Sequence, residues 1–507
     1  MRQRIEVNLP ELYSVLEQAR HQPLSDPDYQ KLITALEALA GLAAPTRATE
    51  KTKSVLPAAD NAPSEEQATE KKPRQPGHGR NGAAAFTGAE KVAIRHPELQ
   101  AGDSCPSCET GKVYQQRQPK TIIRVVGKAP LEATVYEMER WRCNACGEVF
   151  TAPEHADMGP DKYDESAVAM IALLKYGGGV PFYRLGKLER NLGIPLPPAT
   201  QWEAVEGAAE MLKPALEELI QQAAQGDVLH NDDTSMRVLR LAREPSDERT
   251  GVFTSGIVAT HRGRMIPLFF TGRQHAGENL ADVLKRRADE LRSPIQMSDA
   301  LSRNVPKLAS GMEVLIARCL AHGRRQFVNV AANFPAECGY VLEALGQVYG
   351  FDTETSKRGL VPEERLAFHQ QHSGPVMKEL ESWLKAQLAE KKTEPNSGLG
   401  KAITYLLNHW KGLTAFLRDI NAPLDNNLCE RALKRAVLHR KNALFYKSLN
   451  GAQVGDLFMS LIHACELCAA NPFDYLTQLQ KHARELAEKP ARWMPWNYRD
   501  ALAAAGV

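Results

Sequence analysis

The stretch that decides the fold is Gly226-Asp-Val-Leu-His-Asn-Asp-Asp-Thr-Ser-Met-Arg-Val-Leu-Arg-Leu241, in which two adjacent acids lie between two apolar runs. The residues before the acids predict a short strand, Val228–His230, that ends at Asp232 and Asp233. Three further strands are predicted after the acids, at Met236–Ala242, Val252–Ala259 and Met265–Phe270.

The sequence after these strands predicts a helix and then two more strands. A helix is expected from about Gly277, because Leu280, Val283, Leu284 and Leu291 are spaced to share one face. The next strand, Ser293–Asp299, again stops at an acid, and Val314–Cys319 follows as another. This order is typical of an RNase H-like α/β core, in which acids at neighbouring strand ends converge on one site.

Glu430 is a candidate third acid on a predicted helix that begins at Asp425-Asn-Asn, where Asp and Asn favour a helix N-terminus. Basic residues surround it along the same helix. Two interpretations remain open: Glu430 forms a surface ion pair with Lys434, four residues on, or the helix delivers a carboxylate to a metal pair while the cations hold phosphates.

Composition sets outer limits on function. The 507 residues suffice for several domains, and the 63 Lys and Arg nearly balance the 61 Asp and Glu, so net charge alone does not indicate a polyanion partner. No apolar run reaches the ~20 residues that span a bilayer, and Met1–Pro10 has no apolar signal region. We therefore expect a cytoplasmic protein whose nine cysteines bind metal or are buried thiols.

Two Cys-x-x-Cys pairs, Cys105/Cys108 and Cys143/Cys146, predict one structural zinc ion held by four thiolates. Between them, Thr121–Val126 and Ala133–Cys143 are predicted strands. We therefore expect a zinc ribbon over residues 83–157. A catalytic zinc is not expected there, because four cysteines leave no open position.

The remaining chain is divided by composition and periodicity. Residues 1–42 predict an N-terminal helical region, either a dimerising or DNA-binding element or a plain surface pair, and residues 43–82 a disordered basic linker. Residues 158–225 are expected to be helical, with a possible DNA-binding helix-turn-helix at Arg184–Val205. The later boundaries are 226–328 for the first part of the core, 329–420 for a helical insertion, 421–450 for the core helix with Glu430, and 451–507 for a C-terminal helical segment.

Several motifs together resemble the insertion-sequence-66 family of bacterial DDE transposases. They are Asn231-Asp-Asp-Thr234, Gln296-Met-Ser-Asp299, Cys319-Leu-Ala-His-Gly-Arg-Arg-Gln-Phe327, Asn427-Leu-Cys-Glu430-Arg, Arg440-Lys-Asn-Ala-Leu-Phe445, Leu457–Leu467 and Asn471-Pro-Phe-Asp-Tyr-Leu476. With the zinc ribbon, the resemblance covers most of the chain from about residue 75.

The resemblance implies a DDE triad of Asp232, Asp299 and Glu430 that holds two Mg²⁺ or Mn²⁺ ions. It implies cleavage of transposon ends and transfer of the freed 3′-hydroxyl into target DNA. The expected partners are double-stranded DNA, a second copy of the chain in a dimer or larger synaptic complex, and small accessory proteins, and nucleoid association is expected. Two alternatives are a nuclease of the same fold that does not join strands, and a non-catalytic DNA-binding protein.

The sequence departs from the family pattern at two places. Asp233 stands where the family commonly has Glu, and the residues after Asp299 differ from the frequent Gly-Tyr. Because strand neighbours point to opposite faces, we expect only one of the two adjacent acids to reach the metals, and Asp232 aligns with the family's first acid.

Further candidates lie near the predicted sheet ends and on the basic helix. Cys319 and His322 are similar to a Cys-x-x-His element of other DDE transposase families; they either act near the phosphate or are a packed thiol and a helix-capping histidine. Candidate DNA-binding residues are His322, Arg324, Arg325, Arg431, Lys434, Arg435, Arg440 and Lys441.

Overall fold

The computed structural model describes residues 83–505, apart from residues 87–88, 90, 109, 147, 154–158, 160 and 242–248. The helical region expected over 1–42 and the linker expected over 43–82 lie outside the described residues. The described chain divides into two compact units. The sheet unit comprises residues 213–470 and 484–505, and the amino-terminal unit comprises residues 83–212 and 471–483.

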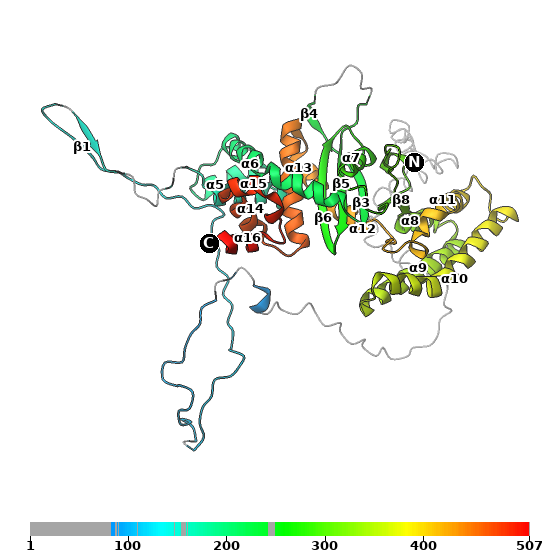
Figure 1. Cartoon of the computed structure of the whole chain (residues 1–507), viewed down its shortest axis with the longest axis horizontal. Helices are drawn as coiled ribbons and strands as arrows, with labels where there is room; N and C mark the ends of the chain where they lie inside the picture. The colour runs from blue at the N-terminus through cyan, green and yellow to red at the C-terminus, as the bar shows by residue number, and fades with distance from the viewer. Residues whose placement is uncertain are drawn as a thin grey trace, which may run out of the picture. The chain divides into compact units, whose positions relative to one another are not determined.

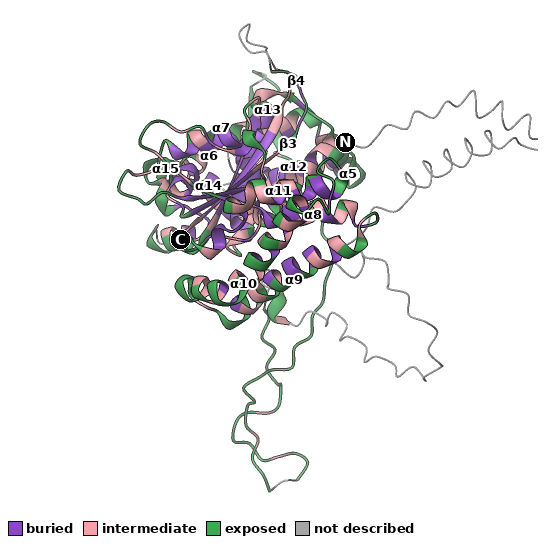
Figure 2. Ribbon diagram, turned by 90° about the vertical axis from the view of Figure 1, so that its right-hand side faces the viewer, coloured by how far each residue is buried: buried purple, intermediate pink, exposed green. Residues whose placement is uncertain are grey.

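The sheet unit is built on a mixed five-stranded sheet, drawn in green in Figure 1. Its strands are β3 (Val228–Ser235), β5 (Phe253–His261), β6 (Arg264–Gly272), β7 (Ile295–Ser298) and β8 (Leu315–Arg318). The spatial order is β6-β5-β3-β7-β8, with antiparallel pairing from β6 to β3 and parallel pairing from β3 to β8. Figure 2 shows the inner strands of this sheet largely buried, whereas β8 at its edge exposes Leu315 and Ile316.

The first strand is longer than the sequence pattern predicts. Asp232 and Asp233 lie inside β3, paired with Gly256 and Ser255 of β5, and not beyond the end of the strand. The parallel pairing with β7 stops earlier, at His230. The acids therefore project past the last paired residue on one side of β3 while the other side continues to hydrogen-bond.

The order of elements is three antiparallel strands, helix α7 (Ala276–Leu284) and two parallel strands. This mixed α/β arrangement is compatible with an RNase H-like core. Helix α7 is shorter than expected: it ends at Leu284, so Leu291 lies outside it and is 40% exposed.

Opposite faces of the sheet carry different helices. Helix α7 lies on the face of Ser255, whose hydroxyl accepts a hydrogen bond from Asn279 Nδ2 at 2.9 Å. Helix α12 (Asn427–Ala443) lies on the other face, where the Cys429 thiol donates to the carbonyl of Gly256 at 3.2 Å. Asp232 pairs with Gly256 and Asp233 with Ser255, and neighbouring strand residues point to opposite faces. The side chain of Asp232 therefore lies on the face covered by α12, and that of Asp233 on the face covered by α7.

Strand β6 is an edge strand of the sheet, and its free edge is covered by helix α13 (Leu449–Leu467). Ser460 Oγ accepts from the Phe269 amide at 3.0 Å, and Asp456 accepts from the amide and the hydroxyl of Thr271 at 2.6 and 2.7 Å. These bonds satisfy donors that an edge strand otherwise leaves unpaired.

A helical block follows β8 and shares one apolar core with the sheet. It consists of α8 (Leu320–Val330), α9 (Pro335–Arg358), α10 (Pro362–Ala389), α11 (Gly398–Leu413) and the short turn η5 (Ala415–Leu417). Its core joins strand residues such as Met297 and Ala317 to Leu345, Leu380 and Leu406 of the helices. Helix α10 runs through Pro375 without a break.

A second, two-stranded sheet lies apart from the central one. The strand predicted at Met236–Ala242 is reduced to β4 (Val238–Arg240), which pairs in parallel with β9 (Tyr446–Ser448). It therefore does not extend the central sheet. The remaining elements of the sheet unit are η4 (Ser302–Asn304), α15 (Ala483–Glu488), which begins at the unit boundary, η6 (Pro490–Arg492) and α16 (Tyr498–Ala505).

The amino-terminal unit is helical beyond residue 164. It contains α4 (Glu165–Ala172), the π-helical turn η3 (Leu173–Gly177), α5 (Phe182–Asn191), α6 (Pro198–Ala224) as far as Leu212, and α14 (Pro472–Lys481). Helices α5 and α6 follow one another across a short turn, as in the predicted helix-turn-helix. Gln201 fixes their packing by donating to the carbonyls of Phe182 and Leu196.

The cysteine-bearing part of this unit has fewer strands than predicted. Residues 121–126 form no strand and are exposed. In the described part of this segment, β1 (Arg140–Arg142) pairs with β2 (Val149–Thr151) around the second cysteine pair, and an isolated bridge joins Ser104 to Lys112 around the first. A single turn, η1 (Ala83–Ala85), precedes them. Through the described part of the chain, no helix combines the length and apolar character needed to cross a membrane.

Candidate active site

Asp232 and Asp299 come from neighbouring parallel strands. The last paired residues are His230 of β3 and Met297 of β7. Asp232 and Asp299 each stand two residues further along their chains, so continuing the register places them side by side. The parallel pairing of β3 with β7 thus delivers one acid from each strand to the same edge.

Asn304, at the end of η4, joins the two acids. Its side-chain Nδ2 donates to Asp299 Oδ1 at 2.7 Å and to Asp232 Oδ1 at 3.2 Å. The Asn304 carbonyl in turn accepts from Asn231 Nδ2 at 2.7 Å and Gln296 Nε2 at 3.1 Å. The amide bridge is therefore fixed to the same two strands that carry the acids.

The electrostatics of Asp232 reflect its crowded position. The pKa of Asp232 is raised to about 7, chiefly by burial and further by the nearby charges of Asp299 and Asp233, against the lowering effect of hydrogen bonds from the Asp233 amide and from Asn304. A carboxylate beside like charges in a partly buried site is destabilised until a cation neutralises it. The Asp232 environment thus favours a bound cation or a proton.

The Asp233 side chain contacts a histidine and an arginine and not the other acids. Its side chain is only 1% exposed, and its oxygens contact His275 Nδ1 at 2.8 Å and Arg303 Nη2 at 3.2 Å. Because His275 is the residue before α7, this cluster ties the end of β3 to the start of that helix. Asp233 is therefore held in ion pairs on the face of the sheet away from α12.

Glu430 lies in the first turn of α12, and Asn426 fixes where that helix begins. Asn426 is fully buried; its Nδ2 donates to the Asn231 carbonyl at 3.1 Å, and its Oδ1 lies 3.1 Å from His230 Nδ1. Its amide donates to Cys319 Sγ at 3.3 Å. These bonds attach the start of α12 to β3 and to the end of β8.

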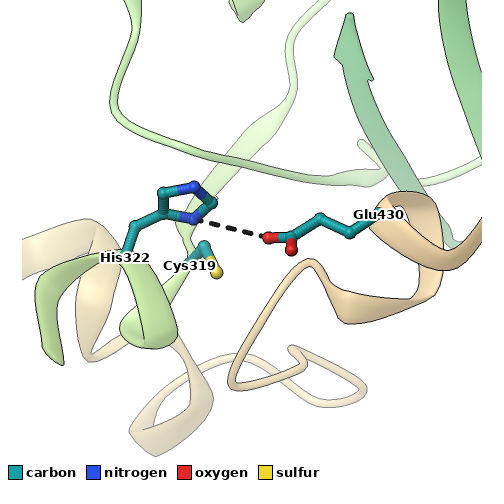
Figure 3. Close-up of side chains that lie close together, drawn as sticks. All are labelled: Cys319, His322 and Glu430. Carbon is teal, nitrogen blue, oxygen red and sulfur yellow. Dashed lines mark ion pairs between the residues drawn. The ribbon is translucent and has the colours of Figure 1, made fainter. Parts of the chain in front are cut away.

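The ion pair that the structure shows for Glu430 is with His322, not with Lys434. Glu430 Oε1 lies 3.6 Å from His322 Nδ1, and Cys319 Sγ completes a group whose ligand atoms all lie within 4.8 Å of one another (Figure 3). In the part of the chain that the structure describes, this is the one group of three such residues at that spacing. Asp232, Asp299 and Glu430 do not form so tight a group.

The Cys429 thiol nevertheless lies near both Glu430 and Asp232. Burial raises the pKa of the Cys429 thiol well above its usual value, and the charges of Asp232 and Glu430 raise it further. The charges of both carboxylates therefore act on one thiol, which projects from α12 toward Gly256 of the sheet. Glu430 belongs to the same face as Asp232.

The predicted DNA-binding residues differ in how far they are free to contact a ligand. Arg431, Lys434 and Lys441 are exposed. Arg435 is paired with Glu466, and Arg440 donates to the hydroxyls of Thr234 and Ser235 at 3.0 and 2.7 Å. Half-buried residues among the candidates are His322, Arg324 and Arg325 of α8.

The two cysteine pairs each form a turn, but the structure does not bring them together. The Cys105 amide donates to the Gly111 carbonyl at 2.7 Å, and the Cys143 amide to the Glu148 carbonyl at 2.9 Å. Backbone hydrogen bonding from Gly111, followed by bonds from Thr110, lowers the pKa of the Cys108 thiol to about 7. The first turn thus favours a thiolate, although the four sulfurs are not gathered into one group.

Sequence reasoning missed two site residues, Asn304 and Asn426. Each is fully buried and joins segments that are far apart in the chain. The available signals were weak: an Asn five residues after Asp299, and the Asp-Asn-Asn run that precedes Glu430. That run was predicted to cap the helix, but the Asn426 side chain makes no cap hydrogen bond and instead contacts Asn231 and His230 of β3.

The fold and site define a mixed α/β protein that gathers carboxylates at one edge of its central sheet, beside a helix rich in cations. The model of the family described as "Transposase IS66 family" matches residues 162–454, and the chain belongs to this family. Membership implies transposase activity, binding of DNA and the use of divalent metal ions.

Similar proteins come from Sinorhizobium fredii (strain NBRC 101917 / NGR234). "Uncharacterized protein y4jD" is 28% identical over 377 residues, which cover 71% of this chain and 71% of that protein. "Uncharacterized protein y4hP" is 25% identical over 446 residues, covering 82% of this chain and 76% of that protein. These relatives extend the similarity beyond the matched family region.

Proposed function

We propose that the chain is a DDE transposase in which Asp232, Asp299 and Glu430 hold two Mg²⁺ or Mn²⁺ ions, cut transposon ends and transfer the 3′-hydroxyl to target DNA. The observation that carries the proposal is the shared hydrogen bond of Asn304 to Asp232 and Asp299. It supports a role for the two acids as one unit at the edge of the parallel strands.

The donor set fits such ions. Carboxylate oxygens are the ligands that Mg²⁺ prefers, and Asn304 Oδ1 is a buried acceptor without a hydrogen-bond partner beside them. When bound, the ions would neutralise charge at the scissile phosphate and activate the attacking oxygen. The chain's own residues hold the acids in place: Asn304 spaces the aspartates, and Asn426 sets the start of the helix that carries Glu430.

The basic residues of α12 and α8 are proposed to bind the DNA backbone. Arg431, Lys434 and Lys441 are exposed and lie on the helix of Glu430, which suits phosphate contacts near the acids. We extend this role to His322, Arg324 and Arg325. Arg435 forms an ion pair with Glu466, and Arg440 donates to the hydroxyls of Thr234 and Ser235. To contact DNA, each arginine would have to give up these intramolecular contacts.

The finer organisation of the chain is likewise proposed. Cys105, Cys108, Cys143 and Cys146 would close one structural zinc ribbon, and the α5–α6 pair would read DNA as a helix-turn-helix. A dimer or larger synaptic complex would pair two transposon ends, and small accessory proteins and association with the nucleoid would accompany the activity.

A strand-transfer assay tests the proposal against its alternatives. Pre-cut transposon ends and supercoiled target DNA are incubated with the full chain and Mg²⁺. Joined product supports the transposase. Nicks without joining contradict strand transfer and favour a nuclease of the same fold, and a mobility shift without cleavage favours a non-catalytic DNA-binding protein.

A further inference from the structure

We propose that Cys319, His322 and Glu430 form a binding site for a borderline-soft divalent cation such as Zn²⁺, which shares Glu430 with the proposed Mg²⁺ pair. Figure 3 shows the three side chains pointing toward one another, two from the start of α8 and one from α12. The 3.6 Å between His322 Nδ1 and Glu430 Oε1 is close to the about 3.3 Å that separates nitrogen and oxygen ligands of tetrahedral zinc.

Two of the three ligand atoms lack any other partner. His322 Nδ1 and Glu430 Oε1 are shielded from solvent and make no hydrogen bond. The two atoms face each other at 3.6 Å, so their only partner in the described part of the chain is one another across a distance too long for a hydrogen bond. A cation between them satisfies both at once.

The backbone that carries the ligands is firmly held. Cys319 and His322 are three residues apart at the start of α8, so they share one face. The Cys319 amide donates to the Ser298 carbonyl at 2.9 Å, and the next amide, of Leu320, donates to the Leu424 carbonyl at 2.9 Å. The Asn426 amide donates to Cys319 Sγ at 3.3 Å, which fixes the position of the sulfur. Burial outweighs this bond and raises the pKa of the Cys319 thiol to about 11, so the bound cation itself must stabilise the thiolate.

The mixture of ligands selects the class of ion. A thiolate, an imidazole and a carboxylate suit zinc and similar ions, whereas Mg²⁺ prefers an all-oxygen octahedral shell. Coordination displaces the Cys319 thiol proton to solvent. Three protein ligands leave a fourth position open to water or another oxygen.

One consequence rests on the proposed function. If Glu430 serves the Mg²⁺ pair, an ion bound by Cys319 and His322 withdraws that carboxylate, so Zn²⁺ inhibits Mg²⁺-dependent cleavage. The binding of the ion itself is independent of transposition and is tested separately.

Titration of the metal-stripped full chain with Co²⁺ tests the site. Cys319→Ser and His322→Gln are each expected to lose about one equivalent of Co²⁺ relative to wild type. The difference spectrum between wild type and Cys319→Ser should contain a thiolate-to-cobalt charge-transfer band. Any absorbance from cobalt bound to the four ribbon cysteines is the same in both proteins and cancels in this difference. The matched control is Cys468→Ser, whose sulfur lies on α13's C-terminus and outside the cluster. Equal stoichiometry in all four proteins and a flat difference spectrum would overturn the proposal.

Zinc inhibition of DNA cleavage supplies the second readout. Each protein's Mg²⁺-dependent rate is normalised to its own zinc-free rate. The Zn²⁺ concentration for half inhibition should rise by about 10-fold or more in Cys319→Ser relative to Cys468→Ser, and equal concentrations contradict the inhibitory role. Absence of cleavage in every protein contradicts the proposed function and leaves the Co²⁺ titration to decide the metal site.

Discussion

Asp232 and Asp233 are neighbours in the chain, but their side chains make different contacts because they point to opposite sides of β3. Asp232 shares Asn304 with Asp299, whereas Asp233 is enclosed by His275 and Arg303. The alternation of side chains along a strand separates a candidate metal ligand from an ion-paired residue that joins β3 to α7.

The two acids should therefore respond differently to the same substitution. Asp232→Asn is expected to lower Mg²⁺-dependent cleavage by more than the about 10–100-fold that loss of a supporting partner costs. Asp233→Asn should retain more activity but lower the unfolding free energy, because it weakens the pairs with His275 and Arg303. Cleavage rates and denaturant unfolding of both variants check this, and a reversed order of activities places the metal ligand at Asp233.

At this scale, the sequence draws attention to the three acids but not to the residues that hold them in place. Strand pattern and family motifs single out Asp232, Asp299 and Glu430, because charged residues beside apolar runs are conspicuous. Asn304 and Asn426 act through hydrogen bonds to residues 72 and 195 positions away. Such pairings have no periodicity in the sequence, so only the folded chain reveals them.

Helix α7 illustrates how an element positions the site. A Cβ on Gly277 would lie 2.5 Å from the Val305 carbonyl oxygen and 2.6 Å from that of Arg303. The missing side chain therefore lets the backbone on either side of Asn304 pack directly against the helix.

Gly277→Ala should displace that backbone and disturb the aspartate pair. We expect weaker Mg²⁺ binding, by about 10–100-fold as for loss of an outer-shell partner, measured by isothermal titration calorimetry. The matched control is Gly346→Ala in α9, where a Cβ meets nothing within 4 Å and should stabilise the helix by up to about 1 kcal/mol. Unchanged Mg²⁺ affinity in Gly277→Ala would show that the packing of this segment does not set the site.

Helix α13 brings a buried acid against β6. Asp456 accepts two hydrogen bonds from Thr271, yet burial raises the pKa of its carboxyl to about 7. A raised carboxyl pKa means that the folded chain binds the proton more tightly than the unfolded chain. The contribution of Asp456 to stability is thus fully present below about pH 4 and is lost as pH rises toward 7.

Asp456→Asn should remove this pH dependence. The unfolding free energy of wild type minus that of Asp456→Asn is expected to fall between pH 5 and pH 8, by on the order of a few kcal/mol. Urea unfolding at several pH values checks the sign, with Asp289→Asn on the exposed surface as the control. A difference that is constant with pH contradicts the role assigned to burial.

Element prediction succeeded where a segment's own pattern decides its structure. The strands of the central sheet and helix α7 form where their apolar periodicity predicts them. The pattern of β4, in contrast, does not reveal that its pairing partner is β9. Residues 121–126 are rich in β-branched side chains but remain unpaired, because strand formation depends on packing against a neighbour. Helix α10 continues through Pro375 because the packing of its buried face outweighs the local cost of proline.

At the scale of the whole molecule, the chain combines the sheet unit with a cysteine-bearing amino-terminal unit. The exposed apolar residues of the latter, such as Ile122, Val125 and Trp141, fit a segment whose folding requires a metal.

Cys143→Ser should release about one zinc ion per chain and weaken DNA binding, because it opens the proposed ribbon. Zinc content by elemental analysis and a mobility-shift titration check the two effects. The control is again Cys468→Ser. Zinc content equal to that of wild type would eliminate the ribbon.

The central claim, that three carboxylates cut DNA together, is tested most directly by Glu430→Gln. Mg²⁺-dependent cleavage of a transposon end and affinity for that same DNA are measured on one preparation, beside Glu343→Gln, a matched change on the exposed side of α9. We expect Glu430→Gln to abolish cleavage while end binding stays close to that of wild type and of Glu343→Gln. Equal loss of binding and cleavage, or cleavage that persists, would contradict it.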